Sequence, residues 1–344
     1  MRENGFIRSS LPEFGQGLFR GGTLRAAPAQ GQDRPISKQM NSLIKTADRV
    51  DLTSAQAARM GLLSLLLSPC FLAAAWLAGG KGLGVHLFSI RKGLRLTAKK
   101  PSKLYAKWIY YPLDSTRYFE IDFVQRLAGK FQTWLDLSSP RLIAALLLSR
   151  NPQASSTLLN PDSTDIAETR EMAELLGFKC TTINSTIDAV DPGARFDLVT
   201  CVSVLEHIPN DFDVLNKLWQ MLNPGGRLIL TVPACADGGT QLIDRDPYGT
   251  QEKVEGGYFF QRFYSGDGLR KLEQITGRPA VLEIWGEREK GWLQANFEHK
   301  RHDLLYPVWR EPYSMARNWR RFESIDQLPG EGVMCAVYEK AKGT

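Results

Sequence analysis

Residues 195–234 read RFDLVTCVSVLEHIPNDFDVLNKLWQMLNPGGRLILTVPA and decide the fold class. Phe196–Val204 is an apolar, β-branched run of strand length that breaks at Glu206–Asn210. Asn223–Gly226 has the composition of a turn, and Arg227–Pro233 is a second run typical of a buried strand. Between them, Asp211 or Asp213 is expected to cap a helix. The apolar face of that helix comprises Val214, Leu215, Leu218 and Leu222. A strand, a helix and a strand in about forty residues predict a βαβ unit in a parallel α/β sheet.

The flanking sequence repeats this alternation. Glycines at 177 and 277 are expected to end two of the helices. The predicted strands are Thr133–Leu137, Ser156–Asn160, Cys180–Asn184, Ala280–Trp285 and Gly332–Glu339, and the predicted helices are Pro140–Arg150, Thr164–Leu176 and Asp267–Thr276. With the two strands of the first stretch, seven strands are expected.

The sequence motif FDLV…VLEHIPN…LNPGGRLILTVP resembles that of the class I S-adenosylmethionine-dependent methyltransferases, and it is most similar to their type 11 group. The resemblance covers about Phe131–Lys342. It implies a Rossmann-like seven-stranded sheet, mostly parallel, with the last strand antiparallel beside the fifth. It also implies S-adenosylmethionine as cofactor and methyl transfer to a small or a lipid- or sugar-linked polar acceptor.

The glycine motif of that family is altered in this chain. Asp136 holds the acidic place after the first strand, whereas Ser138, Pro140 and Leu142 hold the three glycine places. Either Asp136, Ser138 and Ser139 bind the cofactor through a serine-rich variant of the loop, or binding is lost, because Pro has no N–H to donate. In the second case the chain is a non-catalytic, membrane-associated binding or scaffold protein on the same fold.

The resemblance places further cofactor contacts at the ends of neighbouring strands. Asn160 stands where the family has a ribose-binding acid, and Asp162 follows it, although Asp162 is equally suited to cap a helix. Asn184, Ser185 and Asp188 are the candidates near the adenine, and Val202 and Ser203 line the cleft.

Glu206 and His207 are the predicted catalytic residues, because they follow a strand at the edge where open parallel sheets bind ligands. Histidine has a pKa suited to a general base near neutral pH. The alternative is that Glu-His only orients the loop. The glycine-rich loop 236–263 and the insertion Gly291–Glu331 are candidate walls of an acceptor pocket.

The first 109 residues differ in composition from the rest of the chain. Residues 1–40 predict a disordered tail, residues 41–109 an apolar and basic helical extension, and residues 110–344 the methyltransferase-like domain. Residues 60–80 lack charged side chains until Lys81, and residues 86–107 are rich in Lys and Arg. This pairing suits an anionic membrane surface. A membrane span, a half-inserted hairpin and a helix buried on the domain are the alternatives.

Charge and composition also indicate which kinds of partner and compartment to expect. A net charge of +6 without a recognisable motif does not favour nucleic acid as a partner. The five cysteines have no metal-ligand spacing and indicate buried thiols in a reducing compartment. His299 and His302 lack an identifiable third ligand, so no metal site is predicted. We therefore expect a cytoplasmic protein, attached to the membrane if residues 60–107 bind it; the sequence leaves its oligomeric state open.

Overall fold

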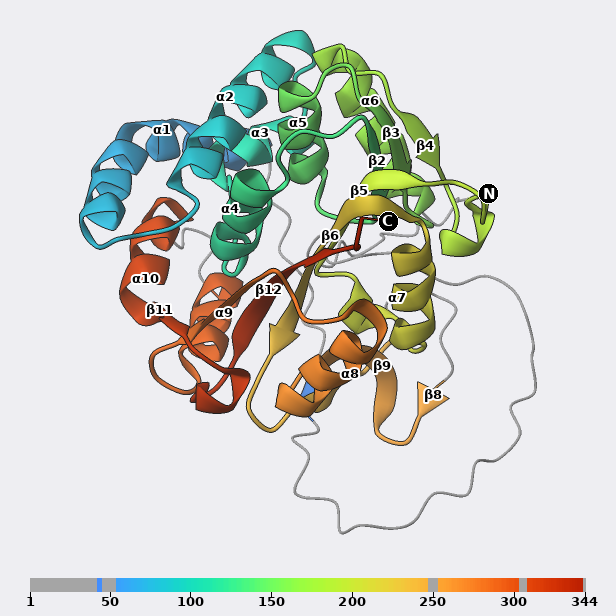
Figure 1. Cartoon of the computed structure of the whole chain (residues 1–344). Coiled ribbons are helices and arrows are strands. Elements are labelled where there is room, and N and C mark those ends of the chain that lie inside the picture. The colour runs from blue at the N-terminus through green and yellow to red at the C-terminus, as the bar shows by residue number, and fades with distance from the viewer. Residues whose placement is uncertain (1–41, 45–53, 247–252, 303–307, 343–344) are drawn as a thin grey trace, which may run out of the picture.

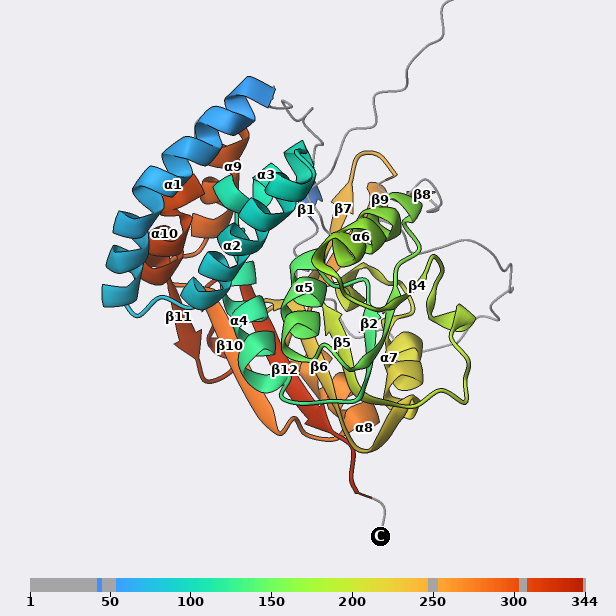
Figure 2. The ribbon, with the colours of Figure 1, turned by 90° about the horizontal axis from the view of Figure 1, so that it is seen from above.

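The structure is a computed structural model that describes residues 42–44, 54–246, 253–302 and 308–342. The tail expected at residues 1–40 lies outside this part of the chain. The central element is a sheet that runs through the middle of the molecule, with helices on both faces (Figures 1 and 2).

The central sheet confirms the expected order of strands. Its parallel part contains β4, β3, β2, β5 and β6, and β12 lies antiparallel beside β6. From one edge to the other the strands are β11 (Trp319–Phe322), β10 (Val281–Glu287), β12 (Gly332–Glu339), β6 (Leu222–Ala234), β5 (Phe196–Val202), β2 (Thr133–Leu137), β3 (Ser155–Leu159) and β4 (Thr181–Ile183). The seven expected strands are present, and β11 from the insertion 291–331 adds an eighth at the edge.

Two hydrophobic cores cover the two faces of this sheet. Side chains alternate between the faces, so Trp134 of β2 belongs to one core and Leu135 to the other. The first core is covered by α4 (Arg117–Leu127), α5 (Arg141–Arg150) and α6 (Ser163–Leu176). The second is covered by α7 (Asp211–Gln220) and α8 (Gly266–Thr276).

The boundary between α7 and β6 differs from the expected one. The strand begins at Leu222, which pairs with Phe196, rather than at Arg227. Residues Asn223–Gly226 remain within the strand as an irregular segment, because Gly225 takes a φ of 77° and its N–H donates to Lys340 O at 2.9 Å. Leu222 therefore belongs to the sheet and not to the apolar face of the helix.

The expectation of a glycine-rich loop at 236–263 is wrong. Within the described residues this segment forms β7 (Gly239–Ile243), β8 (Lys253–Val254) and β9 (Gly257–Phe263). They join the short β1 (Ser42–Ile44) in a second sheet, ordered β1-β7-β9-β8. Short runs of apolar and aromatic residues, such as Leu242-Ile243 and Tyr258-Phe259-Phe260, carry the strand signal that the neighbouring glycines mask.

The N-terminal extension forms an outer helical layer of α1 (Ser54–Leu77), α2 (Leu83–Lys99) and α3 (Lys103–Tyr110). The helix α1 contacts α3 and α10 (Glu311–Asn318), and α2 contacts α3 and α4. A hydrogen bond of 2.8 Å between His86 Nδ1 and Tyr118 Oη joins α2 to α4. Residues 60–77 lie within one continuous helix, not a hairpin. In the ranges that the structure describes, no helix is both long enough and apolar enough to cross a membrane.

The insertion 291–331 is also more regular than its composition indicated. Besides α10 and β11 it contains α9 (Trp292–His302) and two short 3₁₀ turns, η3 (Val308–Arg310) and η4 (Ile325–Gln327). Trp319 of β11 stacks on Phe119 of α4, with 5.2 Å between ring centroids. The insertion therefore packs against the helix α4 instead of standing apart as a loop.

Candidate functional site

The topology places a crevice between β2 and β5. The chain runs from β2 outward through β3 and β4, and then returns to the other side of β2 to form β5 and β6. Ligands of open α/β sheets bind at such a switch point, outside the carboxyl ends of the strands. Residues 136–139 and 202–207, the centre of the predicted site, lie at these two strand ends. They are joined directly, because Val202 N–H donates to Ser139 Oγ at 3.2 Å.

Two serines at the crevice have left-handed backbones. Ser138 and Ser203 each have a φ of 50°, and within the described chain only Ser115 shares a positive φ among residues other than glycine. Such conformations are uncommon for residues with a Cβ and gather at functional sites. Ser138 occupies a glycine place of the family motif and keeps the backbone conformation that glycine adopts readily. Its N–H and hydroxyl both donate to Leu159 O, at 2.8 and 3.1 Å.

Asp136 is buried beneath this loop. Its carboxylate accepts hydrogen bonds from the Thr200 hydroxyl and from Ser139 N–H, the latter at 3.1 Å. Burial raises the pKa of Asp136 to about 6, although these hydrogen bonds oppose the rise. Asp136 therefore carries a negative charge at neutral pH and fixes the loop that follows β2.

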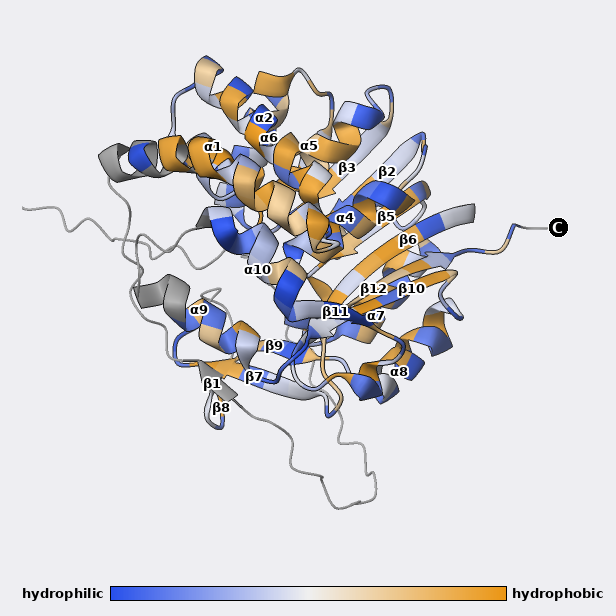
Figure 3. Ribbon diagram, turned by 90° about the vertical axis from the view of Figure 1, so that its left-hand side faces the viewer, coloured by the Kyte–Doolittle hydropathy of each residue, from blue (hydrophilic) through white to orange (hydrophobic). Residues whose placement is uncertain are grey.

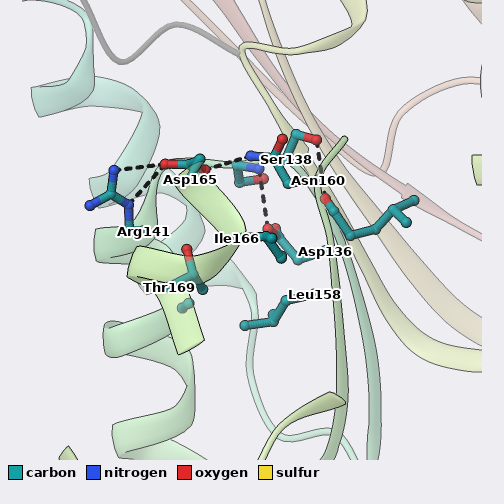
Figure 4. Close-up of a pocket in the computed structure, with 11 residues that line it drawn as sticks. Asp136, Ser138, Arg141, Leu158, Asn160, Asp165, Ile166 and Thr169 are labelled. Carbon is teal, nitrogen blue, oxygen red and sulfur yellow. Dashed lines mark hydrogen bonds and ion pairs between the residues drawn. The ribbon is translucent and has the colours of Figure 1, made fainter. Parts of the chain in front are cut away.

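The side of the crevice at β3 is held by charged side chains (Figure 4). Asn160 Oδ1 accepts from Asp162 N–H at 2.9 Å, and its Nδ2 donates to the Asp165 carboxylate. Asp165 in turn pairs with Arg141 of α5 at 2.7 Å. Asp162 is the N-cap of α6, where it accepts from Thr164 N–H at 2.7 Å. The cavity among these residues is about 10 Å³, which is room for one water molecule.

Glu206 and His207 form a buried pair in the short turn η2 (Leu205–His207) directly after β5. His207 Nδ1 lies 2.7 Å from Phe260 O of β9, so this nitrogen carries the proton and donates it. His207 Nε2 lies 3.7 Å from Glu206 Oε1. Burial lowers the pKa of His207 to about 4 and raises that of Glu206 to about 8. Both side chains are therefore uncharged at neutral pH.

A further buried carboxylate at the site belongs to Glu120 of α4, which none of the sequence motifs marks. Glu120 is fully buried and accepts from the hydroxyls of Ser203 and Thr231, the latter at 2.7 Å. It also pairs with Arg117 at 3.1 Å, one turn earlier on α4. Glu120 thus ties α4 to the carboxyl ends of β5 and β6.

A second set of contacts that the sequence did not predict holds β9 against the segment that follows η2. Arg262 Nη1 lies 2.6 Å from Asp211 Oδ1, and the Tyr264 hydroxyl donates to Asp211 Oδ2 at 2.7 Å. Asp211 is thus the first residue of α7 but uses its side chain to hold β9 and not to cap the helix.

The remaining predicted residues lie at the margins of the crevice. Val202 is fully buried and contributes its N–H. Ser185 follows the edge strand β4 and is half-buried. Beside it, Asn184 Nδ2 donates to Asn160 O and Pro161 O, which orders the end of β3. No cluster of metal-binding side chains occurs among the residues described, which do not include the side chains of His299 and His302.

The donor set at the crevice fits S-adenosylmethionine. The left-handed Ser138 and the hydroxyl of Ser139 provide the close backbone and polar groups that the glycine loop of the family gives its cofactor. On the β3 side, Asn160 has the acceptor and donor that a ribose needs. It reaches a ribose only by giving up its present bonds to Asp162 and Asp165.

Comparisons with known proteins show relatives of the same general kind. Residues 125–228 match the family model described as a methyltransferase domain. Two ubiquinone biosynthesis O-methyltransferases are similar. That of Chromobacterium violaceum is 29% identical over 201 residues, which cover 53% of this chain and 82% of the relative. That of Alkalilimnicola ehrlichii is 24% identical over 179 residues, covering 51% and 67%.

Among solved structures, the N-terminal domain of EvdMO1 with SAH bound is 13% identical, with a TM-score of 0.41, covering 66% of this chain and 82% of that one. The family match, the curated relatives and the strand order, with its antiparallel β12, lead to one assignment. The matches support a methyltransferase domain of the class I S-adenosylmethionine-dependent type, a family whose cofactor is S-adenosylmethionine.

Proposed function

We propose that this chain transfers a methyl group from S-adenosylmethionine to a hydroxyl group of a small or a lipid- or sugar-linked acceptor. The observation that carries the proposal is a neutral histidine with a fixed tautomer at the carboxyl end of β5, next to the switch point. The names of the two curated relatives, both O-methyltransferases, support oxygen as the attacking atom.

In this proposal the residues of the chain align the acceptor and receive its proton. When bound, S-adenosylmethionine supplies an electrophilic methyl group on its sulfonium. Asp136, Ser138 and Ser139 hold the cofactor, with Asn160 on the ribose side and Ser203 and Val202 lining the cleft. His207 Nε2 accepts the acceptor's proton, since Nδ1 already donates to Phe260 O. Above about pH 8 the ionised Glu206 stabilises the resulting imidazolium, so turnover rises with pH through that region.

Calorimetric titration of the full chain with S-adenosylhomocysteine tests the cofactor part. We expect binding in the wild type and its loss in Asp136→Asn, because the loop loses the charge that Ser139 N–H is bonded to. Asp267→Asn, a change on the surface of α8 where the side chain is 78% exposed, is the matched control and should bind normally. An absence of binding heat from wild type at high protein concentration would sink the cofactor claim.

A second candidate is the non-catalytic, membrane-associated binding or scaffold protein. It is favoured by the cavity of about 10 Å³ beside Asn160 and by Pro140, which has no N–H to offer a ligand. The two candidates separate in an assay that measures S-adenosylhomocysteine released from S-adenosylmethionine in the presence of hydroxyl-bearing small molecules and lipids. Release that depends on an acceptor supports the enzyme, and binding without release supports the scaffold.

A further inference from the structure

The helix α1 presents an apolar stripe to the outside of the molecule. Leu62, Leu66, Trp76 and Leu77 are each between 61% and 79% exposed. Counted from Leu62, the other three lie four, fourteen and fifteen residues along the chain, which places all four on one face of the helix. Exposed Leu65, Pro69, Cys70 and Ala73 complete the same stripe. A surface helix normally turns its polar face outward, so α1 has the reverse of the usual pattern.

The opposite face of α1 packs against the rest of the protein. Ser68 and Ala75 are buried where the helix lies against α3 and α10. Figures 2 and 3 show α1 as the outermost helix of its layer, and Figure 3 colours most of it as hydrophobic. Within the described residues, eight of the nine exposed large apolar side chains belong to α1 and α2; the ninth is Val254 of β8. The exposed apolar surface is therefore gathered on this layer.

Positive charge accompanies the stripe. Exposed Arg59 and Lys81 lie beyond its two ends. On α2, exposed Leu87 and Leu94 alternate with exposed Arg91 and Arg95. The chain contains no Asp or Glu between Asp51 and Asp114, a stretch that holds nine Lys and Arg residues.

The charges on α2 also lie close to one another. Burial lowers the pKa of Lys92, and the positive charges of Arg95 and Arg91 lower it further. A surface that crowds cations next to exposed leucines is complementary to a phase that is anionic outside and apolar within.

We propose that the face formed by α1 and α2 docks on an anionic lipid bilayer, with α1 lying in the plane of the interface. The stripe from Leu62 to Leu77 is roughly 22 Å long at the rise of an α-helix, and Trp76 is the residue type that prefers the interfacial region. A second copy of this chain is a poorer partner, because a two-fold contact would bring the same cations together. The inference is independent of the proposed methyl transfer.

Flotation of the full chain with lipid vesicles tests the proposal. Vesicles of phosphatidylcholine with 30% phosphatidylglycerol should carry the protein, and vesicles of phosphatidylcholine alone should carry much less. The triple variant Leu62→Gln/Leu66→Gln/Leu77→Gln should lose at least about tenfold in affinity, since each change removes an inserted apolar side chain. The double variant Lys253→Gln/Val254→Gln, which changes an exposed cation and an exposed apolar residue on β8, is the matched control and should bind like wild type.

The charge component is tested separately with Arg91→Gln/Arg95→Gln. Each cation near an anionic surface contributes roughly fivefold in affinity, so this variant should lose roughly 25-fold on the anionic vesicles and little on neutral ones. Circular dichroism and S-adenosylhomocysteine binding report whether the variants stay folded. If the triple variant unfolds, the single change Leu66→Gln takes its place, because that side chain is exposed and its loss leaves no cavity.

Three results would overturn the proposal. The first is that wild type fails to float with anionic vesicles. The second is that the folded leucine variant floats as well as wild type. The third is light scattering that shows a dimer of wild type that the leucine variant abolishes, together with no flotation, which assigns the stripe to a second copy.

Discussion

The two sides of the crevice are held by different kinds of interaction. On the β5 side, Glu206 and His207 are buried and uncharged at neutral pH, and His207 is fixed by a backbone carbonyl. On the β3 side, Asn160 is held by Asp165, whose carboxylate is part of an ion pair with Arg141. Buried contacts to backbone keep the first side in one arrangement, whereas a partly exposed ion pair can exchange partners at small cost. The β5 side is thus suited to chemistry and the β3 side to adapting to a ligand.

The largest effect is expected on the β5 side. His207→Gln removes the proposed base and should lower kcat by about 10² to 10⁴-fold, the usual contribution of a general base. Binding of S-adenosylhomocysteine should change little, because in the proposed mechanism the imidazole acts on the acceptor and not on the cofactor. Steady-state kinetics and calorimetry check the two halves of this statement. Activity that survives in the variant would leave His207 with only the role of orienting the loop.

The next effect concerns stability and pH. The folded-state pKa of Glu206 is raised from its ordinary value of 4.5 to about 8, so between these two pH values the folded protein holds a proton that the unfolded chain has released. The free energy of unfolding therefore falls as pH rises through this window. Glu206→Gln removes that contribution. Urea unfolding at several pH values should give a flatter profile for the variant, and identical slopes would contradict the assignment.

A smaller effect is expected on the β3 side. Asp165→Ala frees Asn160 Nδ2 and should strengthen S-adenosylhomocysteine binding by roughly fivefold, the value of about one hydrogen bond. Glu168→Ala is the control, because it removes another carboxylate from Arg141, at 2.6 Å, without touching Asn160. Weaker binding in Asp165→Ala would mean that Asp165 itself contacts the ligand.

The smallest effect concerns the left-handed serine. Ser138→Gly relieves the backbone strain and should raise stability by about 1 kcal/mol, less the loss of one hydrogen bond to Leu159 O. Ser139→Gly, at a neighbouring position without a positive φ, should lower stability instead. Thermal unfolding of the two variants checks the difference in sign.

The sequence predicted the strands and helices of the central sheet well, but it did not predict the strands of the second sheet. The strand order followed from residues 196–234 and the family wording, and the helices α5, α6 and α8 begin and end within one residue of the expected positions. The strands β7 and β9 were missed, because each is short, begins at a glycine and lacks a clear alternation of polar and apolar residues. Long-range pairing, not local propensity, makes them strands.

In the site, too, some contacts could be predicted from the sequence and others could not. Asp136, Ser139 and Val202 meet as the resemblance implied, since they lie at the ends of adjacent parallel strands. The ion pair between Arg141 and Asp165 joins residues of two helices that are 24 positions apart in the sequence. The buried Glu120 accepts hydrogen bonds from Ser203 and Thr231, which are 83 and 111 positions away. Nothing in the local sequence specifies such contacts, which depend on how the helices pack on the sheet.

The bond from His207 to Phe260 has a consequence for substrate selection. Phe260 belongs to the second sheet, 53 residues along the chain, and its carbonyl raises the pKa of an imidazole that burial otherwise lowers. A molecule that pushes β9 aside on entering would break this bond and weaken the histidine as a proton acceptor. A molecule that leaves β9 in place keeps the histidine at full basicity. The protein would then discriminate between acceptors through their effect on a proton affinity, and not only through the fit of their shape.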